Sequence, residues 1–247
     1  MKLDLHIHSY RSHDGMERID KIINTAIKRG LDGIAICDHD VFGAYDEAKR
    51  VAQAQERTPV PDGFVVIPGV EYSTDAGHVL ALFVTRGYEL RRDARGLCRL
   101  VDLRMAASAD GALLVAAHPF RKRETLPDIL MPNVDGVEVA NARDTVKTPG
   151  NTAKSRAVAA EHGKFITGGS DGHILQEIGM CYTILPDNTE RTPEGVRAAL
   201  LSGSTDGGGD GGRLRYQAQS KLRKTKPKKF FKDLARFIVF TAKDVTG

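Results

Sequence analysis

The first 40 residues read MKLDLHIHSYRSHDGMERIDKIINTAIKRGLDGIAICDHD, with apolar runs at 3–7 and 33–37. Between the two runs, apolar residues at 19–27 repeat at the spacing of one helix face, and Gly30 is well placed to end that helix. Strand, helix and strand in this order are typical of a βαβ unit, in which the two strands are parallel. The stretch therefore predicts an α/β fold.

The same alternation continues along most of the chain. Predicted strands lie at 3–7, 33–37, 64–70, 112–117, 134–140, 164–168 and 181–185. Seven such strands with intervening helices predict a parallel (β/α) barrel. An eighth apolar run, at 78–84, follows the third strand too closely for a helical crossover, so we expect it to form a hairpin with that strand.

Composition is that of an ordinary globular protein. The 247 residues are 41% hydrophobic and 28% charged, which suits one large domain with an appendage. No apolar stretch approaches the roughly 20 residues needed to span a bilayer, and no signal-peptide pattern opens the chain, so we expect a cytoplasmic protein. Cys37, Cys98 and Cys181 are widely scattered, which predicts reduced, buried thiols rather than disulfides.

Charge is divided unevenly along the chain. Residues 213–247 contain eleven Lys and Arg against two Asp, whereas the preceding part is acidic overall. The glycine-rich run at 203–212 has the composition of a flexible linker or long loop. We therefore expect a catalytic body at 1–202, a linker at 203–212 and a basic, partly amphipathic extension at 213–247.

The extension contains an apolar stripe of Phe230, Phe231, Leu234, Phe237 and Ile238 beside its basic residues. We expect this stripe to dock on the barrel as a closing helix, with the lysines in solvent. Binding to an anionic membrane surface and binding to nucleic acid are the two alternatives.

Polar side chains follow the predicted strands at the points where the strands end. In a parallel barrel these ends meet at one mouth, where catalytic groups gather. Six of the eight histidines lie there, and they are His6, His8, His39, His78, His118 and His173. A lone His-x-His pair is weak evidence for a metal. The carboxylates Asp14, Glu71 and Asp171 at equivalent ends strengthen it, because clustered cations need anionic ligands.

The motifs DLHIHSYRSHDG, AICDHD, PGVEYS, GHVLAL, AAHPF, VEVANAR and GGSDGH together resemble those of the polymerase and histidinol phosphatase family, the PHP family of metal-dependent phosphoesterases. The resemblance implies a distorted seven-stranded barrel with three metal ions at its C-terminal mouth. It implies that His6, His8, Glu71 and Asp171 hold one ion, that Glu71, His78 and His118 hold a second, and that Asp14, His39 and His173 hold the third. The ligand at the SHDG motif is either Asp14 or His13, and we favour Asp14.

Mixed imidazole and carboxylate ligands suit two to three zinc, manganese or iron ions, among which the residues do not choose. Such a multinuclear site predicts phosphoester hydrolysis through a bridging hydroxide, with Glu71 and Asp171 as catalytic ligands. Arg143 is the first choice for binding the phosphate during catalysis, and Arg121 is the second. Asp38 and Asp40 are candidates for orienting ligand histidines, and Asp40 is equally a candidate helix cap.

The substrate class stays open among a small phosphorylated metabolite, a nucleotide and an oligonucleotide end. Two other functions compete with the hydrolase. One is a metal-free RNA-binding or scaffold protein of the same fold. The other is a C–N hydrolase of the amidohydrolase type, because His-x-His also ends the first strand of those barrels. The complete set of nine ligand positions favours the phosphoesterase.

Overall fold

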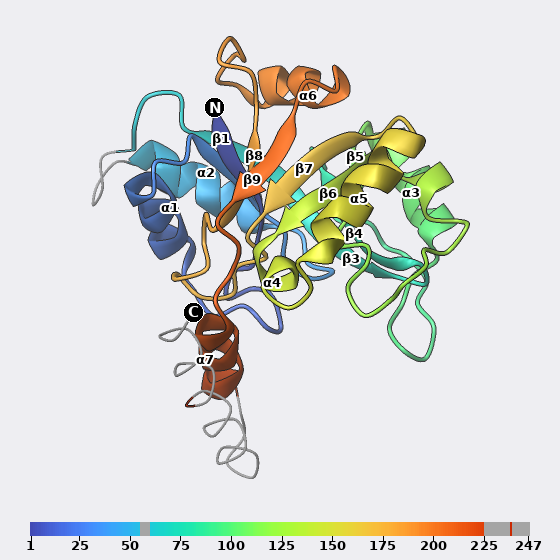
Figure 1. Ribbon diagram of the computed structural model, residues 1–247. Coiled ribbons are helices and arrows are strands. Elements are labelled where there is room, and N and C mark those ends of the chain that lie inside the picture. Colours follow the sequence, from blue (N-terminus) through green and yellow to red (C-terminus); the bar gives the residue numbers. More distant parts are fainter. Residues whose placement is uncertain (55–59, 225–237, 239–247) are drawn as a thin grey trace.

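The computed structural model describes residues 1–54, 60–224 and 238. Within them, nine strands form one mixed sheet that curves into a nearly closed barrel (Figure 1). The strands are β1 (Lys2–Ile7), β2 (Gly33–Ile36), β3 (Val65–Thr74), β4 (Gly77–Leu82), β5 (Leu113–Ala116), β6 (Gly136–Asn141), β7 (Phe165–Gly169), β8 (Cys181–Ile184) and β9 (Asp206–Gly209).

Helices cover the outside of the barrel and both of its ends (Figure 1). They are α1 (Ile19–Lys28), α2 (Ala44–Ala54), α3 (Leu100–Asp110), α4 (Ala142–Thr145), α5 (Gly150–Glu161), α6 (Pro193–Leu201), α7 (Leu214–Lys224) and the 3-10 turn η1 (Met131–Asn133). Val196 and Leu200 of α6 pack into the interior cluster with Leu3 and Leu5, so α6 closes the end where the strands begin. None of the described helices is long and apolar enough to cross a membrane.

The sheet order is β7-β6-β5-β4-β3-β2-β1-β8-β9. The predicted hairpin at 78–84 is confirmed, because β4 runs antiparallel between β3 and β5. The prediction of seven parallel strands is wrong on two points. The described residues contain nine strands, and β8, the last predicted strand, runs antiparallel to β1. The segment between β7 and β8 contains no helix, so the chain turns back instead of crossing over.

Backbone hydrogen bonds join the end of β1 to the segment after β7. They close the wall of the barrel at its mouth end. The His8 N–H donates to the Gly172 carbonyl at 2.9 Å, and the Asp171 N–H donates to the His6 carbonyl at 2.7 Å. These bonds place the His-x-His pair of the first strand beside the SDGH segment that follows β7.

A bulge in β1 turns the two histidines into the barrel. Asp4 pairs with Ile34 and Ile7 pairs with Ile36, so β1 has one residue more than β2 in this interval. The extra residue shifts the alternation of the two faces. Leu5 therefore points into the interior cluster, whereas Ile7 packs outside against α1. His6 and His8 are consequently buried inside the mouth.

The predicted glycine-rich linker is in part a strand. Residues 206–209 form β9, which pairs with β8. Glycine suits this close packing, because a Cβ on Gly207 would lie 2.8 Å from the Thr167 carbonyl oxygen. Arg156 donates to the Gly207 carbonyl at 2.8 Å and holds the strand from α5.

The first part of the basic extension, α7, lies at the mouth end of the barrel (Figure 1). Gln217 Nε2 donates to the Arg143 carbonyl at 2.7 Å, and Arg223 donates to Glu17 at 2.9 Å. Four of the five stripe residues, Phe230 to Phe237, lie outside the described residues, so docking of the stripe stays a prediction. All three cysteines are free and buried, as expected.

Candidate metal centre

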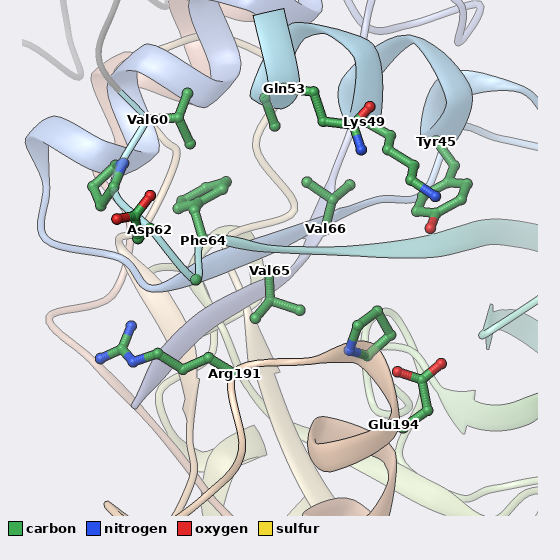
Figure 2. A pocket seen from close by; sticks show the side chains of 14 residues that line it. Tyr45, Lys49, Gln53, Val60, Asp62, Phe64, Val65, Val66, Arg191 and Glu194 are labelled. Carbon is green, nitrogen blue, oxygen red and sulfur yellow. The ribbon is translucent and has the colours of Figure 1, made fainter. Parts of the chain in front are cut away.

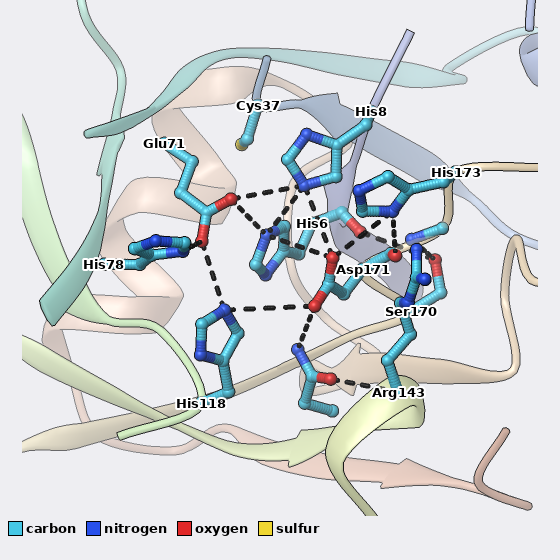
Figure 3. A network of polar contacts seen from close by, with 12 residues as sticks. His6, His8, Cys37, Glu71, His78, His118, Arg143, Ser170, Asp171 and His173 are labelled. Atoms are coloured by element: carbon cyan, nitrogen blue, oxygen red, sulfur yellow. Dashed lines mark hydrogen bonds and ion pairs between the residues drawn. The ribbon is translucent and has the colours of Figure 1, made fainter. Parts of the chain in front are cut away.

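Glu71 of β3 lies among the histidines at the mouth of the barrel (Figure 3). Its side chain is 1% exposed. Oε1 lies 2.9 Å from His78 Nδ1 and 3.2 Å from His118 Nε2. Oε2 lies 3.2 Å from a ring nitrogen of each of three further histidines, which are His6, His8 and His39. One carboxylate therefore contacts five imidazoles from four strand ends.

Asp171 contacts three of these histidines, His6, His8 and His118, from the opposite side (Figure 3). Its Oδ1 lies 3.4 Å from His8 Nε2 and 4.0 Å from His6 Nε2. The backbone of Asp171 has φ of 53°, in the left-handed region that a non-glycine residue rarely adopts. Such conformations persist where the surroundings hold them, and they cluster at functional sites.

A third group of candidate ligands lies beside the loop that follows β1. Asp14 Oδ2 is 2.6 Å from His173 Nε2 and 3.6 Å from His39 Nε2. His13 is exposed, and its ring centroid lies 5.1 Å from that of His39. The placement favours Asp14 over His13 as the ligand.

The donor atoms fit divalent metal ions. Among the described residues, four overlapping groups have ligand atoms within 4.8 Å of one another. They are His8, Asp14, His39 and His173; His6, His8 and Asp171; His6, Glu71 and His118; and His39, Glu71 and His78. Glu71 Oε2, His8 Nδ1 and His39 Nδ1 are buried and form no hydrogen bond of acceptable geometry, although Oε2 lies 3.2 Å from His39 Nδ1. Buried polar atoms are otherwise almost always paired, so these atoms are suited to coordination. The three predicted ligand sets lie within this cluster.

Two of the histidines are held neutral by their surroundings. Burial, together with Arg121, lowers the pKa of His118 to about 4. Burial, His8 and Arg143 lower the pKa of His173 to about 3. Neutral imidazole is the form that binds a metal, so both side chains are ready to do so near neutral pH.

His8 shows the opposite tendency in the protein without metal. Although burial lowers its pKa, Asp171 and Glu71 raise it to about 9. The two carboxylates thus stabilise the protonated, positively charged form of the His8 ring. A bound metal ion would supply positive charge at the same place. Metal binding at this point would release that proton.

Glu138 of β6 is a site residue that the sequence reasoning missed. Its Oε1 lies 2.9 Å from His6 Nδ1, and its Oε2 accepts the His118 N–H at 2.8 Å. A ligand histidine commonly donates its second ring N–H to a carboxylate, which fixes its orientation. A glutamate in the apolar run VEVA was the available signal, because buried carboxylates are rare.

Arg121 faces the carboxylates of the site. Its Nη2 donates to Asp171 Oδ2 at 2.6 Å and to Asn141 Oδ1 at 2.7 Å. These bonds use one guanidinium nitrogen to position Asp171, so only the remaining N–H groups are left for a substrate. The role of Arg121 in substrate binding stays a prediction.

Arg143 lies in α4 at the end of β6 (Figure 3). Asn141 caps this helix by accepting the Arg143 N–H at 3.0 Å. The Arg143 side chain is 12% exposed, and its Nη1 is 3.6 Å from Glu177 Oε2 with no hydrogen bond. The side chain therefore retains a buried donor near His173.

Asp38 and Asp40 do not orient ligand histidines, contrary to that expectation. Asp38 accepts hydrogen bonds from the N–H and hydroxyl of Ser9, at 2.6 and 2.7 Å. Asp40 accepts from the Ser73 N–H and from Arg92. Asp38 therefore joins the end of β2 to the loop after β1, and Asp40 joins it to β3 and to the segment after β4.

A cavity of about 610 Å³ lies at the end of the barrel opposite the mouth, where β3 begins; Figure 2 shows its lining residues. Tyr45, Phe64 and Val66 supply apolar walls, and Arg191 stands at its edge. Arg191 is already paired with Asp32 at 2.7 Å. The described residues that line the cavity include no histidine, and Lys49 Nζ lies 5.9 Å from the centroid of the Tyr45 ring.

Comparison with known proteins agrees with this geometry. Residues 4–116 match the family described as "PHP domain", and residues 149–205 match the one described as "PHP-associated". The two matches together cover more than half of the chain. The chain belongs to the PHP family.

Relatives with a curated sequence are distant. An uncharacterized protein of Methanocaldococcus jannaschii is 27% identical over 191 residues, which are 74% of this chain and 69% of the relative. A 5′-3′ exoribonuclease of Haemophilus influenzae is 36% identical over 74 residues, but these are only 30% of this chain and 24% of that protein.

Solved structures share the fold. One is a two-domain protein of Bacteroides vulgatus that contains a predicted PHP-like metal-dependent phosphoesterase, with a TM-score of 0.67 and 22% identity over 85% of this chain. The match spans 64% of that protein. PsfC of Pseudomonas syringae has a TM-score of 0.64 and 22% identity, covering 90% of this chain and 96% of its own.

Proposed function

We propose that this chain is a metal-dependent phosphoesterase that hydrolyses its substrate at the barrel mouth. The observation that carries the proposal is the contact of one buried carboxylate, Glu71, with five histidines. A structural role would not require so many imidazoles around one anion. Two to three zinc, manganese or iron ions would suit the donor set, and Glu71 belongs to two of its ligand groups.

Divalent ions at this place would polarise the phosphoryl group and activate water for attack on phosphorus. The protein side chains would hold the ligand groups in position and balance their charge. Glu71 and Asp171 balance the positive charge, and Arg121 and Asn141 hold the Asp171 carboxylate in place. Glu138 holds the His6 ring through Nδ1.

Arg143 is the proposed phosphate-binding residue. Its Nη1 is buried without a hydrogen bond, and the capping bond from Asn141 fixes the start of its helix. A guanidinium can donate two parallel hydrogen bonds to phosphate oxygens. In this position it would stabilise the charge that develops on those oxygens as the ester bond breaks.

The substrate is proposed to be a phosphorylated metabolite, a nucleotide or an oligonucleotide end. The match to the exoribonuclease covers too little of the chain to choose among them. The described part of the basic extension, α7, lies at the mouth and is compatible with each.

The decisive experiment combines elemental analysis with a panel of phosphate mono- and diesters. We expect two to three equivalents of metal per chain, hydrolysis of at least one ester, loss of activity on chelation, and recovery with manganese or zinc. Less than one equivalent of metal after expression in supplemented medium would contradict the proposal. Hydrolysis of amides instead of phosphoesters would favour the C–N hydrolase alternative.

A further inference from the structure

Helix α7 lies outside both family matches, which end at residue 205, yet it contacts the candidate site. Gln217 Nε2 of α7 donates to the Arg143 carbonyl oxygen at 2.7 Å. Gln217 is only 3% exposed, and Ala218 and Ser220 on the same helix are also buried. Through a buried side chain, α7 therefore meets the segment that carries the proposed phosphate-binding arginine.

The helix that carries Arg143 is too short to hold this residue by itself. Helix α4 has four residues, and the end groups of a helix lack partners within it. The Arg143 N–H is satisfied by the Asn141 side chain at 3.0 Å. The Lys147 N–H, which a continuing helix would direct to the Arg143 carbonyl, donates instead to the Asp144 carbonyl at 2.9 Å. Gln217 supplies a donor to the Arg143 carbonyl, so side chains hold the peptide groups on both sides of the Arg143 Cα.

A second contact brings the chain to α4 just before α7 begins. The Gly212 N–H donates to the Ala142 carbonyl at 2.9 Å, and Gly211 has φ of 72°, in the left-handed region. A Cβ on Gly212 would lie 2.3 Å from the Ala142 carbonyl oxygen, so this close approach requires glycine. The approach of the two backbones places Gln217, five residues later, within reach of Arg143.

The other end of α7 contacts the loop after β1. Arg223 donates to Glu17 at 2.9 Å, and Glu17 lies three residues after the candidate ligand Asp14. Helix α7 thus joins the loop that carries Asp14 to the segment that carries Arg143. The Arg223 side chain is 43% exposed, and exposed ion pairs contribute little. The buried contact of Gln217 is therefore the stronger of the two constraints.

The Arg143 side chain depends on its backbone for its position. Its Nη1 is buried without a hydrogen bond and lies 3.6 Å from Glu177 Oε2. No hydrogen bond at Nη1 would restore the place of the guanidinium if the backbone moved. A displacement of about 1 Å in a catalytic group can lower the rate by about 10². Loss of the Gln217 donor would therefore displace the arginine without removing it.

We infer that Gln217 is a positioning residue for phosphoester hydrolysis. It fixes the Arg143 backbone so that the guanidinium meets the substrate phosphate. This role rests on the proposed function and adds to it, since it makes the first helix of the basic extension part of the catalytic unit. The extension at 213–247 is then more than a separate binding arm.

The test uses variants of the metal-loaded, full-length protein. Gln217→Leu removes the donor at similar size, and Gln217→Glu keeps the shape but has only acceptors when ionised. The probes are p-nitrophenyl phosphate and bis(p-nitrophenyl) phosphate or, if neither is hydrolysed, an ester of the wider panel that is. We expect kcat to fall about tenfold with little change in KM or metal content, because a displaced arginine mainly loses the charge that develops in the transition state. Gln219→Leu, a matched change at a partly exposed position of α7, should keep wild-type kinetics.

A double-mutant cycle separates positioning from a general structural role. In an Arg143→Ala background, Gln217→Leu should change kcat by less than about twofold, because its effect passes through the missing guanidinium. A purely structural role predicts the same tenfold loss in both backgrounds.

Three results would overturn the role of Gln217 and leave the phosphoesterase intact. They are equal losses in the two backgrounds, wild-type kcat in both folded Gln217 variants, and loss of the fold in both variants, which would assign Gln217 to stability alone. Circular dichroism and elemental analysis check the fold and the metal content. Failure of the wild-type protein to hydrolyse either probe or any ester of the panel would overturn the proposed function and the role of Gln217 with it.

Discussion

The mouth of the barrel and the cavity at its opposite end differ in how their polar side chains are satisfied. At the opposite end, Arg191 is half exposed and paired with Asp32, and apolar side chains line the cavity together with charged ones such as Lys49. At the mouth, buried histidines surround buried carboxylates, and several of their atoms lack hydrogen bonds. The opposite cavity is larger than the one of about 240 Å³ beside His78 and His118, yet its described lining residues form no such cluster. The clustering of buried histidines with buried carboxylates, rather than cavity size, therefore distinguishes the mouth as the candidate site.

The largest expected effect comes from Glu71→Ala. Loss of the carboxylate that contacts five histidines would leave neighbouring cations in uncompensated repulsion. We expect metal content to fall below one equivalent and kcat/KM to fall more than about 10³-fold, beyond the loss of a single transition-state contact. Elemental analysis and steady-state kinetics measure both. Glu194→Ala, at the opposite cavity, is the control and should change neither; retained metal in Glu71→Ala would remove Glu71 from the centre.

Arg143→Ala should separate catalysis from metal binding. If the guanidinium contacts only the substrate phosphate, metal content stays normal while kcat/KM falls by about 10². Glu177→Gln is the matched control, because it removes the nearby carboxylate while leaving the arginine. Equal losses in the two variants would show that Arg143 acts only by balancing Glu177, and unchanged kinetics would remove it from the site.

Glu138→Gln tests whether the contact with His6 supports the metal centre. The change keeps the size of the side chain but removes the charge that lies 2.9 Å from His6 Nδ1. We expect metal affinity to fall about 10- to 100-fold, with the fold retained. Titration with a competing chelator measures affinity, and circular dichroism checks the fold. Wild-type affinity in a folded variant would reduce Glu138 to a structural role.

The smallest effect should come from the opposite cavity. Arg191→Ala breaks a half-exposed ion pair, for which we expect a loss of stability below about 1 kcal/mol. Metal content and kcat/KM should match wild type. A clear loss of activity would mean that the two ends of the barrel are coupled, which their separate contacts do not suggest.

Much of the site could be predicted from the sequence because its ligands follow strands that are easily recognised. Runs such as GIAIC are apolar and short, and parallel strand ends meet at one mouth. His39 and His118 could thus be grouped although they are far apart in the chain. The position of Asp14 beside His173 agrees with the same reasoning.

Other features depended on contacts between distant segments. The bulge that turns His6 inward arises from the pairing of β1 with β2, and the period of two alone does not show which face is buried. The glycines at 206–209 resemble a linker until β8 offers them a partner. Arg121 resembles a solvated loop charge until Asp171 accepts its hydrogen bond.

The sequence by itself determined the α/β class, the positions of β1 to β8 along the chain and the identity of the clustered histidines, because periodicity and strand ends are local properties. Only the tertiary structure decided the direction of β8, the place of Glu138 against His6 and the contact of Gln217 with Arg143. These features depend on which strands become neighbours, and that choice depends on burial and hydrogen bonding summed over the whole sheet.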